Sequence, residues 1–515
     1  MKAVLPFKLL IMNKKTIILF VLNLLMTYVC KSQQGITNNW LMGYQSAAGY
    51  PGGQTLINFY NGMPVLTYDS LEMDFNHTHS NISDNNGNLR FYTNGFYLAD
   101  ATNDTMQNGS GLSPGAYANA FSDGFGIPQA SLVIPKPNSP NLYYLFHNTA
   151  DGYSQPIPNS ISYNFYLTTI DMNGNGGLGN VISKNVSLLT DSMNPGKIAA
   201  TKHANGRDWW VMIHRVNTNT FYKFLVTPTV ILGPYSQNIG VIRGDGAGQA
   251  WFSPDGKKYA YYYVNGGLDI FDFNRCNGTL SNTVHVTMPF ENGYNVGMAI
   301  SASSNALYVS NTQHVYQFDL TAANIAASQL TVATYDSFVS IPPNCTFCPP
   351  LATLFGLSAL APDGKIYITT GNSTVHMHTI DNPDLIGLGC NVNQHSVQLP
   401  AYYFNTLPNH PNYFLGCDTT CTTCLVGLPD FPEREALTAR ASPNPSNGNF
   451  TLQFPVQMIS GEMEIYDVMG NLVLKEYVAP WSQYKRVNID GLAKGIYLCK
   501  LKWGSIEGSV KVIKE

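Results

Sequence analysis

The residues best suited to chemistry in this chain are its cysteines. Eight of the nine lie beyond residue 32, and five of these fall in two short stretches: Cys345 with Cys348, and the trio Cys417, Cys421 and Cys424. Cysteines of an exported chain meet oxidising conditions, so we expect one disulfide between Cys345 and Cys348 and one within the trio. Zinc is the alternative, because both stretches supply thiolates, but paired C-x-x-C arms of zinc sites are usually more regular.

Two well-known catalytic signatures are missing from the sequence. It contains no H-E-x-x-H zinc motif and no phosphate-binding P-loop. The 11 histidines are scattered. His77 and His79 flank Thr78 and would share one face of a strand, but no carboxylate cluster lies near them, so we expect them at the surface. We therefore predict no catalytic residue, no cofactor and no metal site.

Charge and N-terminal patterning indicate an exported protein. Only 12% of the residues are charged and the net charge is −4, so nothing in the composition favours nucleic acid as a partner. Lys14 and Lys15 precede an apolar run from Thr16 to Val29, and small residues then lead to a cleavage site ahead of Gln33. This pattern predicts a secretory signal peptide at residues 1–32, and no later run is long enough to span a membrane.

The elements that must position any site in the body, residues 33–416, are β-strands. Aromatic and β-branched runs repeatedly follow tight-turn residues, as at Asn86-Gly87, Asn205-Gly206 and Pro254-Asp255-Gly256. Six such turns are centred on positions 86, 138, 205, 255, 305 and 363. A spacing of about 50 residues is typical of a four-stranded propeller blade, so we predict an all-β propeller, with an array of β-sandwiches as the rival.

A propeller must close its ring so that no sheet edge stays open. We expect Trp40–Tyr44 near the start of the body and Asn412–Gly416 near its end to share one blade. Together with the six turn units, this blade predicts a WD40-like propeller of about seven blades, with six and eight as alternatives. The nearest approach to a helical pattern is short and Ala-rich, from Thr321 to Leu330.

The C-terminal part of the chain has a different organisation. Between residues 417 and 440 the strand pattern gives way to Cys, Thr and Pro residues that indicate a linker. From Ala441 to Glu515, short alternating strands with glycine turns predict a small Ig-like β-sandwich. Distinctive residues occur there in a fixed order: Pro443, Asn444, Pro445 and Gly448, then Asp467 and Gly470, then Leu492, Gly495 and Tyr497, and finally Lys511 and Lys514.

With this order and terminal position, the segment resembles the type A C-terminal sorting domain of the type IX (Por) secretion system of Bacteroidota. The resemblance covers residues 441–515. It implies passage through the inner membrane by the signal peptide and recognition by the type IX machinery at the outer membrane. Cleavage of the domain, with attachment to the cell surface or release, would follow. Cys499 within a strand departs from the pattern.

The body is similar to propeller proteins of the same bacteria that carry this sorting tag. The likeness rests on Ser80–Gly95, Met106–Gly109, Ala130–Pro137 and Leu142–Phe146. That family is mostly of unknown activity, so the resemblance implies the fold and leaves the chemistry open.

Aromatic residues on loops could stack on sugars. Six lie near Gly, Ser or Pro and are expected on loops: Tyr117, Phe121, Phe125, Tyr153, Tyr235 and Tyr294. Our leading hypothesis is a non-enzymatic binding or adhesion module that offers its axial face to a glycan or a protein. The alternative is a secreted carbohydrate-active lyase or hydrolase with its site on the same face. Carboxylates paired at about 5–9 Å would favour hydrolysis, and an aromatic, carboxylate-free mouth would favour binding.

Overall fold

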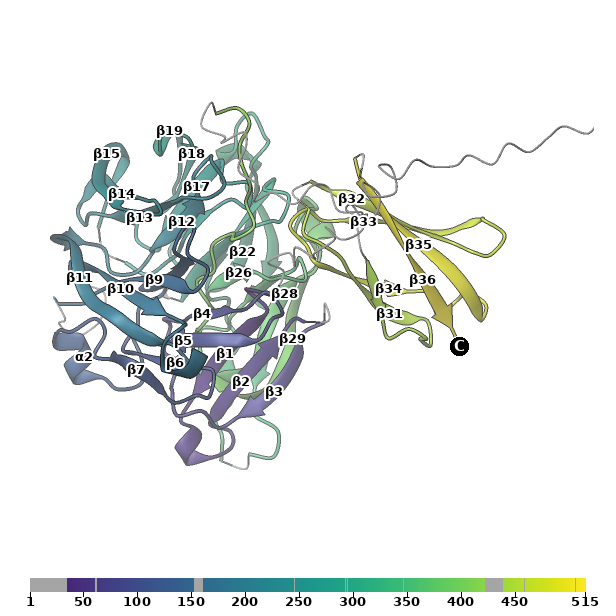
Figure 1. Cartoon of the computed structure of the whole chain (residues 1–515), viewed down its shortest axis with the longest axis horizontal. Coiled ribbons are helices and arrows are strands. Elements are labelled where there is room, and N and C mark those ends of the chain that lie inside the picture. Colours follow the sequence, from purple (N-terminus) through teal and green to yellow (C-terminus); the bar gives the residue numbers. More distant parts are fainter. Residues whose placement is uncertain are drawn as a thin grey trace, which may run out of the picture.

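The computed structural model describes residues 35–60, 63–151, 161–244, 246–291, 293, 295–345, 347–421, 439–457, 459–504 and 506–515. Within these ranges the chain forms a large body of β-sheets and a small one that begins at Arg440 (Figure 1). The predicted signal peptide and most of the predicted linker lie outside the described residues. Among the helices described, none is long and apolar enough to cross a membrane.

The sheets of the large body are the blades of a propeller, which we number in chain order. Blade 1 has β1 (Asn39–Tyr44), β2 (Gly53–Asn58) and β3 (Val65–Asp69). Blade 2 has β4 (Ser80–Ser83), β5 (Leu89–Thr93), β6 (Tyr97–Asp100) and β7 (Thr105–Ser110). Blade 3 has β8 (Ser131–Pro135), β9 (Leu142–Asn148), β10 (Ser162–Asp171) and β11 (Asn180–Met193). A parallel pairing of Gln107 with Asn180 joins blades 2 and 3.

The remaining four blades each have four antiparallel strands. Blade 4 has β12 (Ala199–Lys202), β13 (Trp209–His214), β14 (Thr218–Val226) and β15 (Ile231–Arg243). Blade 5 has β16 (Ala250–Phe252), β17 (Lys258–Tyr263), β18 (Gly267–Asn274) and β19 (Thr279–Val286). Blade 6 has β20 (Val296–Ile300), β21 (Ala306–Asn311), β22 (His314–Asp319) and β23 (Leu330–Thr334). Blade 7 has β26 (Ser358–Leu360), β27 (Ile366–Ile368), β28 (Thr374–Ile380) and β29 (Val392–Tyr403).

The connections between these strands carry only short elements. They are η1 (Ser46–Ala48), α2 (Ala116–Ala120), η3 (Asn175–Gly177), η4 (Ala326–Ser328), η5 (Gly387–Cys390) and the hairpin of β24 (Val339–Ser340) with β25 (Leu351–Ala352). The Ala-rich pattern from Thr321 to Leu330 is thus reduced to the single turn η4.

The repeated turns of the sequence join the first two strands of blades 2 to 7. Each contains a residue with positive φ, a conformation that favours Gly and is tolerated by Asn. Four turns use glycine, for example Gly87 (φ 84°) and Gly256 (φ 70°), and the other two use Asn138 (φ 56°) and Ser304 (φ 64°). This shared requirement explains why the turns stand out in the sequence. The prediction of seven blades is confirmed.

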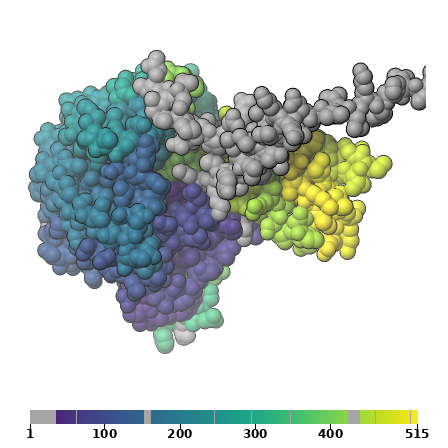
Figure 2. All heavy atoms as spheres, viewed as in Figure 1, coloured from purple at the N-terminus to yellow at the C-terminus, as the bar shows by residue number. Residues whose placement is uncertain are grey.

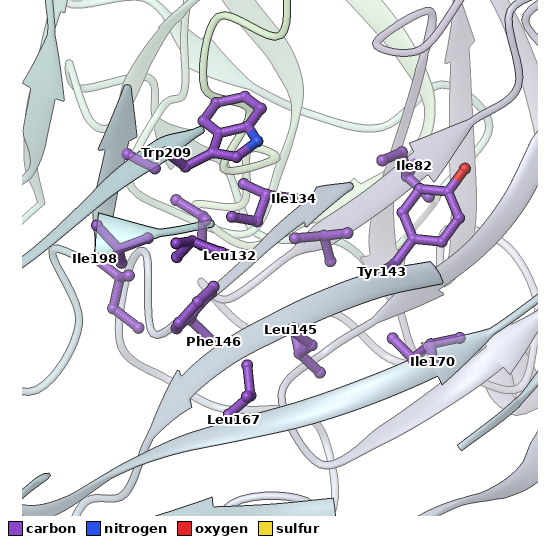
Figure 3. Close-up of a cluster of buried hydrophobic side chains, with 14 of the residues drawn as sticks. Ile82, Leu132, Ile134, Tyr143, Leu145, Phe146, Leu167, Ile170, Ile198 and Trp209 are labelled. Atoms are coloured by element: carbon purple, nitrogen blue, oxygen red, sulfur yellow. The ribbon is translucent and has the colours of Figure 1, made fainter. Parts of the chain in front are cut away.

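Packing between neighbouring blades holds the ring together. One buried cluster joins blades 2, 3 and 4 and includes Ile82, Leu132, Phe146 and Trp209 (Figure 3). All four side chains are 0% exposed. Burying a large apolar side chain contributes about 1.5–3 kcal/mol, so this interface is a main source of stability.

Blade 7 packs on blade 1 in the same way and thereby closes the ring. The Trp40 ring lies edge-on to Phe59 at 5.1 Å and to Tyr367 at 5.5 Å, measured between ring centroids. Trp40 and Phe59 belong to blade 1 and its flank, and Tyr367 belongs to blade 7. Side-chain packing therefore joins the first and last blades.

The prediction that Asn412–Gly416 forms a closing strand is wrong. Residues 412–416 form a turn and irregular backbone. They belong to a segment, Phe404–Gly416, that we call the strap. Pro408 and Pro411 interrupt the strap, and proline has no N–H for a strand ladder.

The strap instead crosses the centre of the ring on side-chain hydrogen bonds. Asn405 Oδ1 accepts from the backbone N–H of Leu357 in the approach to blade 7, at 3.2 Å. Asn409 Nδ2 donates to the carbonyls of Ser131 in blade 3 and Ile198 beside blade 4, both at 2.9 Å. The strap thus contacts the innermost segments of blades on different sides of the ring.

Histidines expected at the surface are enclosed by the strap. His79 is 1% exposed, and the His77 ring is half-buried against Phe404 at 4.9 Å. In the strap itself, His410 Nε2 lies 2.9 Å from Asn81 Oδ1. Burial lowers the pKa of His410 to about 4 and that of His79 well below its usual value. These rings are therefore neutral in the folded protein at neutral pH.

The small body is a β-sandwich. One sheet has β30 (Arg440–Ser442), β31 (Asn449–Gln453) and β34 (Tyr484–Asn488). The other has β33 (Leu472–Val478), β32 (Gly461–Tyr466), β35 (Gly495–Trp503) and β36 (Ile506–Lys514). Cys499 is a free thiol in the core between them, 0% exposed beside residues such as Met463 and Trp503. Burial raises the pKa of its thiol to about 12, so it acts as a small apolar core residue.

Two disulfides join described residues. Cys345 and Cys348 close the expected short loop. Cys421, however, bonds Cys276, which lies 145 residues earlier, and not a member of its own trio. Cys417 is disulfide-bonded too, and Cys424 lies outside the described residues. The long-range bond ties the chain just after the strap to the β18–β19 turn, a pairing that sequence proximity did not indicate.

Loss of the Cys276–Cys421 bond should destabilise the propeller strongly. The chain-entropy estimate for a loop of this length is roughly 5 kcal/mol, against about 2 kcal/mol for the Cys345–Cys348 loop. We expect the Cys276→Ser/Cys421→Ser variant to unfold at clearly lower guanidinium concentration than the Cys345→Ser/Cys348→Ser control. Equal shifts in the two unfolding midpoints would show that the long link does not constrain the unfolded chain.

The neutral His410 ring should make the propeller sensitive to acid. The unfolded state takes up a proton near pH 6.5, whereas the folded state does so only near pH 4, so stability is full above pH 6.5 and falls below it. The expected loss from this group between pH 7 and pH 5 is roughly 2 kcal/mol. His410→Gln should reduce the fall in unfolding free energy over that range. An unchanged fall, equal to that of a His395→Gln comparison variant, would contradict a buried neutral ring.

Candidate functional site

A cavity of about 120 Å³ lies at one end of the propeller axis, and we call it the axial cavity. Its wall comes from the innermost strands of six blades, from the strap and from the sandwich. The lining residues are Thr37, Trp40, Leu132, Ala199, Ala200, Thr201, Trp251, Phe252, Ser253, Pro254, Ala299, Ile300, Ala359, Leu360, Ala361, Pro362, Pro408, Asn409, His410, Pro411, Asn412, Phe414, Trp481 and Gln483. Small alanines from neighbouring blades leave the space that larger side chains would fill.

The axial cavity carries no charge. None of the described residues that line it is Asp, Glu, Lys or Arg. His410 is neutral because burial lowers its pKa to about 4. A pair of carboxylates, which glycoside hydrolysis needs, is therefore absent from this lining. The chemistry available here is contact with an uncharged group.

The polar side chains of the wall are largely occupied by the protein itself. Asn412 Nδ2 donates to the carbonyl of Pro254 at 2.7 Å, and its Oδ1 accepts from the N–H of Phe414 at 3.0 Å. The amide nitrogen of Asn409 is similarly bound to two backbone carbonyls. Few polar groups are left over for a ligand with many hydroxyl groups.

Three polar atoms of the lining residues are exceptions. The indole nitrogens of Trp40 and Trp251 and the Oε1 atom of Gln483 are buried and have no hydrogen-bond partner among the described residues. Leaving a buried polar group unpaired costs about 1–3 kcal/mol, so such groups call for an explanation. These atoms do not face the open space, so an acceptor on a ligand could reach the two N–H donors only after part of the wall is displaced.

The aromatic residues expected on loops do not form this site. Tyr117 and Phe125 are buried in a cluster of their own, with Phe121 packed against it. Tyr235 is 45% exposed but lies on β15, the last strand of blade 4. Tyr153 and Tyr294 lie outside the described residues. The aromatic residues of the cavity stand in or beside inner strands, where the sequence pattern resembles ordinary core.

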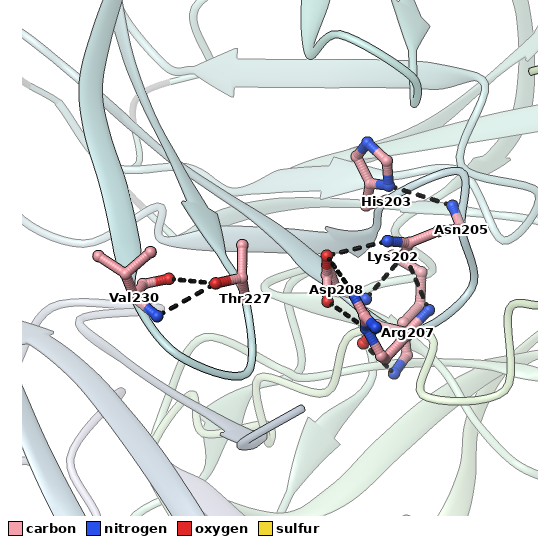
Figure 4. A network of polar contacts seen from close by, with 7 residues as sticks. All are labelled: Lys202, His203, Asn205, Arg207, Asp208, Thr227 and Val230. Carbon is pink, nitrogen blue, oxygen red and sulfur yellow. Dashed lines mark hydrogen bonds and ion pairs between the residues drawn. The ribbon is translucent and has the colours of Figure 1, made fainter. Parts of the chain in front are cut away.

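A charged network lies at the turn between β12 and β13 (Figure 4), where Asn205 pairs with Cys417 just after the strap. Asp208 accepts from Arg207 Nε at 2.7 Å and Nη2 at 3.1 Å, and from Asn205 Nδ2 at 2.9 Å. Nearby, Lys202 Nζ lies 4.0 Å from the Trp209 ring centroid. Desolvation lowers the pKa of Lys202 to about 7, opposed by Asp208. The carboxylate is fully bonded within the turn, so we assign the network a structural role.

Arg275 connects this turn to the end of the strap. Its Nη2 atom donates to the carbonyl of Gly416 at 2.5 Å, and its Nε atom to the carbonyl of Lys202 at 2.9 Å. The neighbouring Cys276 carries the long-range disulfide. The charged groups and the disulfide together fix where the strap leaves the ring.

Other carboxylates with histidine partners lie away from the axial cavity. Glu291 Oε1, for example, accepts from Tyr316 at 2.9 Å and lies 2.8 Å from His314 Nδ1. Neither this group nor Asp336 with His395 is part of the cavity wall. In the part of the chain that the structure describes, no three His, Cys, Asp or Glu residues are placed to hold a metal ion.

The distinctive residues of the C-terminal segment lie on neighbouring turns and strands of the sandwich. Asn444, between Pro443 and Pro445, donates to the carbonyl of Lys511 at 2.7 Å and accepts from Ile513 N–H at 2.8 Å. Gly495 pairs with Lys514 across β35 and β36, and Tyr497 follows in β35. Gly448 (φ 112°) passes Asp490 too closely for a side chain.

Lys514 is buried against the loop that carries Leu492, another of the distinctive residues. It is 7% exposed, and its Nζ atom donates to the carbonyls of Ile489, Asp490 and Leu492 at 3.0, 2.5 and 2.6 Å. The chain terminus is thereby anchored to the loop that carries Leu492.

Two further distinctive residues, Asp467 and Gly470, shape the β32–β33 turn. Asp467 Oδ1 accepts from the N–H groups of Met469 and Asn471, both at 2.9 Å, and Gly470 takes φ 82°. Hydrogen bonds from Asn471 hold the pKa of Asp467 below its usual value. The conformation of this turn thus depends on both Asp467 and Gly470.

Comparisons with known proteins agree with this division of the chain. Residues 441–515 match the family model described as a secretion system C-terminal sorting domain. Comparison with curated proteins gives no match.

Three solved structures illustrate what the chain is similar to. A functionally unknown protein from Desulfotomaculum acetoxidans is 14% identical, covering 73% of this chain and 100% of that one, with a TM-score of 0.41. A putative 6-phosphogluconolactonase from Bacteroides fragilis is 13% identical, covering 73% and 98%, with a TM-score of 0.37. The Dos1 propeller is 8% identical, covering 66% and 91%, with a TM-score of 0.32. Similarities this low say nothing about activity.

The sandwich and the family match lead to one conclusion about the chain's destination. The protein is a β-propeller that carries a type IX secretion C-terminal sorting domain at residues 441–515, which directs its export to the cell surface or the extracellular space.

Proposed function

We propose that the exported propeller is a binding module whose axial cavity receives an uncharged, largely apolar side chain of a protein partner. The single observation that carries this proposal is the charge-free wall, rich in tryptophan, phenylalanine, alanine and proline, around a space on the propeller axis. Apolar contact is the favourable interaction that such a wall offers.

The size of the cavity supports a side chain as the inserted group. With Trp481 and Gln483 of the sandwich in its wall, the cavity measures about 120 Å³, which is less than the roughly 300–1,000 Å³ of pockets that enclose a whole small molecule. One buried side chain in a central pocket is the usual anchor of a protein interface. The unpaired indole nitrogens of Trp40 and Trp251 would suit a carbonyl acceptor next to that side chain.

A glycan fits this wall less well. Sugar hydroxyl groups need several hydrogen-bonding partners, and the asparagines of the wall are engaged with backbone groups. A carbohydrate-active enzyme is disfavoured further, because the described wall lacks the acidic residues that act as acid and base in glycoside hydrolysis.

Filling the cavity should weaken binding without unfolding the propeller. A random-peptide display library and an array of neutral glycans would be presented in parallel to the full chain and to its Trp481→Gly variant, which removes the largest side chain that the sandwich contributes to the cavity wall. We expect apolar peptides to be selected. Ala359→Leu, which adds bulk at the wall, should weaken the binding of the selected peptides at least tenfold, equivalent to about 1.4 kcal/mol.

The matched control for this experiment is Phe347→Ala. Phe347 is 96% exposed on the loop between β24 and β25 and is not part of the cavity wall. This control should bind like the unmodified chain. Selection of glycans alone, or peptide binding that Ala359→Leu leaves unchanged, would contradict the proposal.

The sorting domain should depend on the buried ammonium group of Lys514. Lys514→Met leaves three backbone carbonyls without a donor, and we expect it to lower the stability of the sandwich by about 1–3 kcal/mol. Glu507→Met changes an exposed side chain in the same strand, outside the distinctive residues of this segment, and should have little effect. Limited proteolysis and the amount of exported protein would be measured for both variants. Equal behaviour of the two would contradict the structural role of Lys514.

A further inference from the structure

We propose that the sorting domain plugs the axial cavity, so that the propeller binds its partner only after this domain has been displaced or removed. The inference rests on the proposed function of the cavity. The plug is the loop Trp481–Gln483, which comes directly before β34. Trp481 and Gln483 are the two residues of the sandwich in the cavity wall, where they complete the wall built by the blades and the strap.

Further contacts between the two bodies surround the plug. Asn38 Nδ2, just before β1, donates to the hydroxyl of Tyr484 at 3.3 Å. A Cβ atom placed on Gly364, in the turn between β26 and β27, would lie 3.9 Å from Cβ of Ser482. Tyr484 is 3% exposed, and burial raises its pKa to about 12. In Figure 1 and Figure 2 the sandwich lies beside the propeller.

The backbone of the plug is held in a conformation that its sequence does not favour. Trp481 has φ 62°, which is uncommon for a bulky residue and costs free energy. Hydrogen bonds fix it there: Trp481 N–H donates to Gln457 O at 2.7 Å, and Ser482 Oγ donates to Ala479 O at 2.5 Å. The core of the sandwich does not include Trp481. Packing within the sorting domain therefore does not explain this tryptophan, whereas contact with the axial cavity does.

The docked plug leaves hydrogen-bonding groups at the cavity without partners, and another ligand could supply those partners. The Oε1 atom of Gln483 is buried without a partner, as are the indole nitrogens of Trp40 and Trp251. A second contact between the bodies, from the Tyr477 hydroxyl to Asp384 Oδ2, is long at 3.5 Å. The plug thus supplies apolar contact but leaves polar groups unsatisfied. A partner that brings an apolar side chain and a hydrogen-bond acceptor competes on these terms.

Docking of the plug would be tested by a cross-link in the full chain. Cβ atoms 3.9 Å apart are within the range of about 3.5–4.5 Å that disulfides need, so Gly364→Cys/Ser482→Cys should form a disulfide on air oxidation. Residue 364 has φ 81°, so a cysteine there is strained, and the control carries the same substitution for this reason. The matched control is Gly364→Cys/Lys494→Cys, with its second cysteine at an exposed position of the sandwich. Peptide mass spectrometry would identify the bonds. Failure to cross-link, or equal cross-linking of the control, overturns the plug.

Its effect on binding would be measured with an apolar peptide selected on the Trp481→Gly variant. Glycine tolerates the positive φ of residue 481, so this variant should keep the fold. We expect it to bind the peptide at least tenfold more tightly than the unmodified chain, and the cross-linked chain to bind most weakly. Equal affinity of all three chains overturns the plug but leaves the proposed function intact. If the Trp481→Gly variant binds no peptide while cross-linking succeeds, the proposed function fails and the plug has no ligand to exclude.

Discussion

The strap is the element on which both the closure of the propeller and its axial cavity depend. Innermost strands of a ring have backbone groups that face the axis and lack a further strand as partner. Buried carbonyl groups without a partner cost free energy, and the asparagines of the strap bind several of them, as Asn409 does for Ser131 and Ile198. Because Pro408 and Pro411 prevent a continuous ladder, these contacts are local, and the strap fills the axis only in part. The axial cavity is the part of the axis that remains.

The charged groups near the strap lie apart from the axial cavity. Uncharged asparagines hold the strap across the ring, whereas the ionic and covalent groups lie at its exit, where Arg275 binds Gly416 and Cys276 bonds Cys421. The wall of the cavity contains no ionised side chain among its described residues. Buried charges need partners in the protein, and partners would fill the space and compete with a ligand. Because the ionic and covalent groups lie away from the cavity wall, a rigid ring can surround a site that is open to apolar contact.

The sequence predicted those features that depend on local backbone conformation. Turns such as Asn86-Gly87 and Pro254-Asp255-Gly256 need a residue with positive φ, and this need is visible in residue types. Closure was mispredicted at Asn412–Gly416 because Tyr413 and Phe414 resemble strand residues. How the two nearby prolines affect the closing of the ring depends on tertiary packing, which the local sequence pattern does not show. The cavity could not be located for a related reason. Trp251 precedes a turn in a strand of apolar residues, and only the meeting of several blades distinguishes it from core.

The relation between the sorting domain and the propeller is the feature furthest from any sequence signal. Trp481 lies in a segment whose strands and turns fit an ordinary sandwich, yet its positive φ and its place in the cavity wall are explained by the neighbouring body. A strained loop that leaves Gln483 Oε1, Trp40 Nε1 and Trp251 Nε1 without partners stabilises the closed arrangement only weakly. Weak closure is an advantage if the sorting domain must also engage the export machinery. A plug held more tightly would persist after export, whereas one with unsatisfied polar groups yields to a partner that satisfies them.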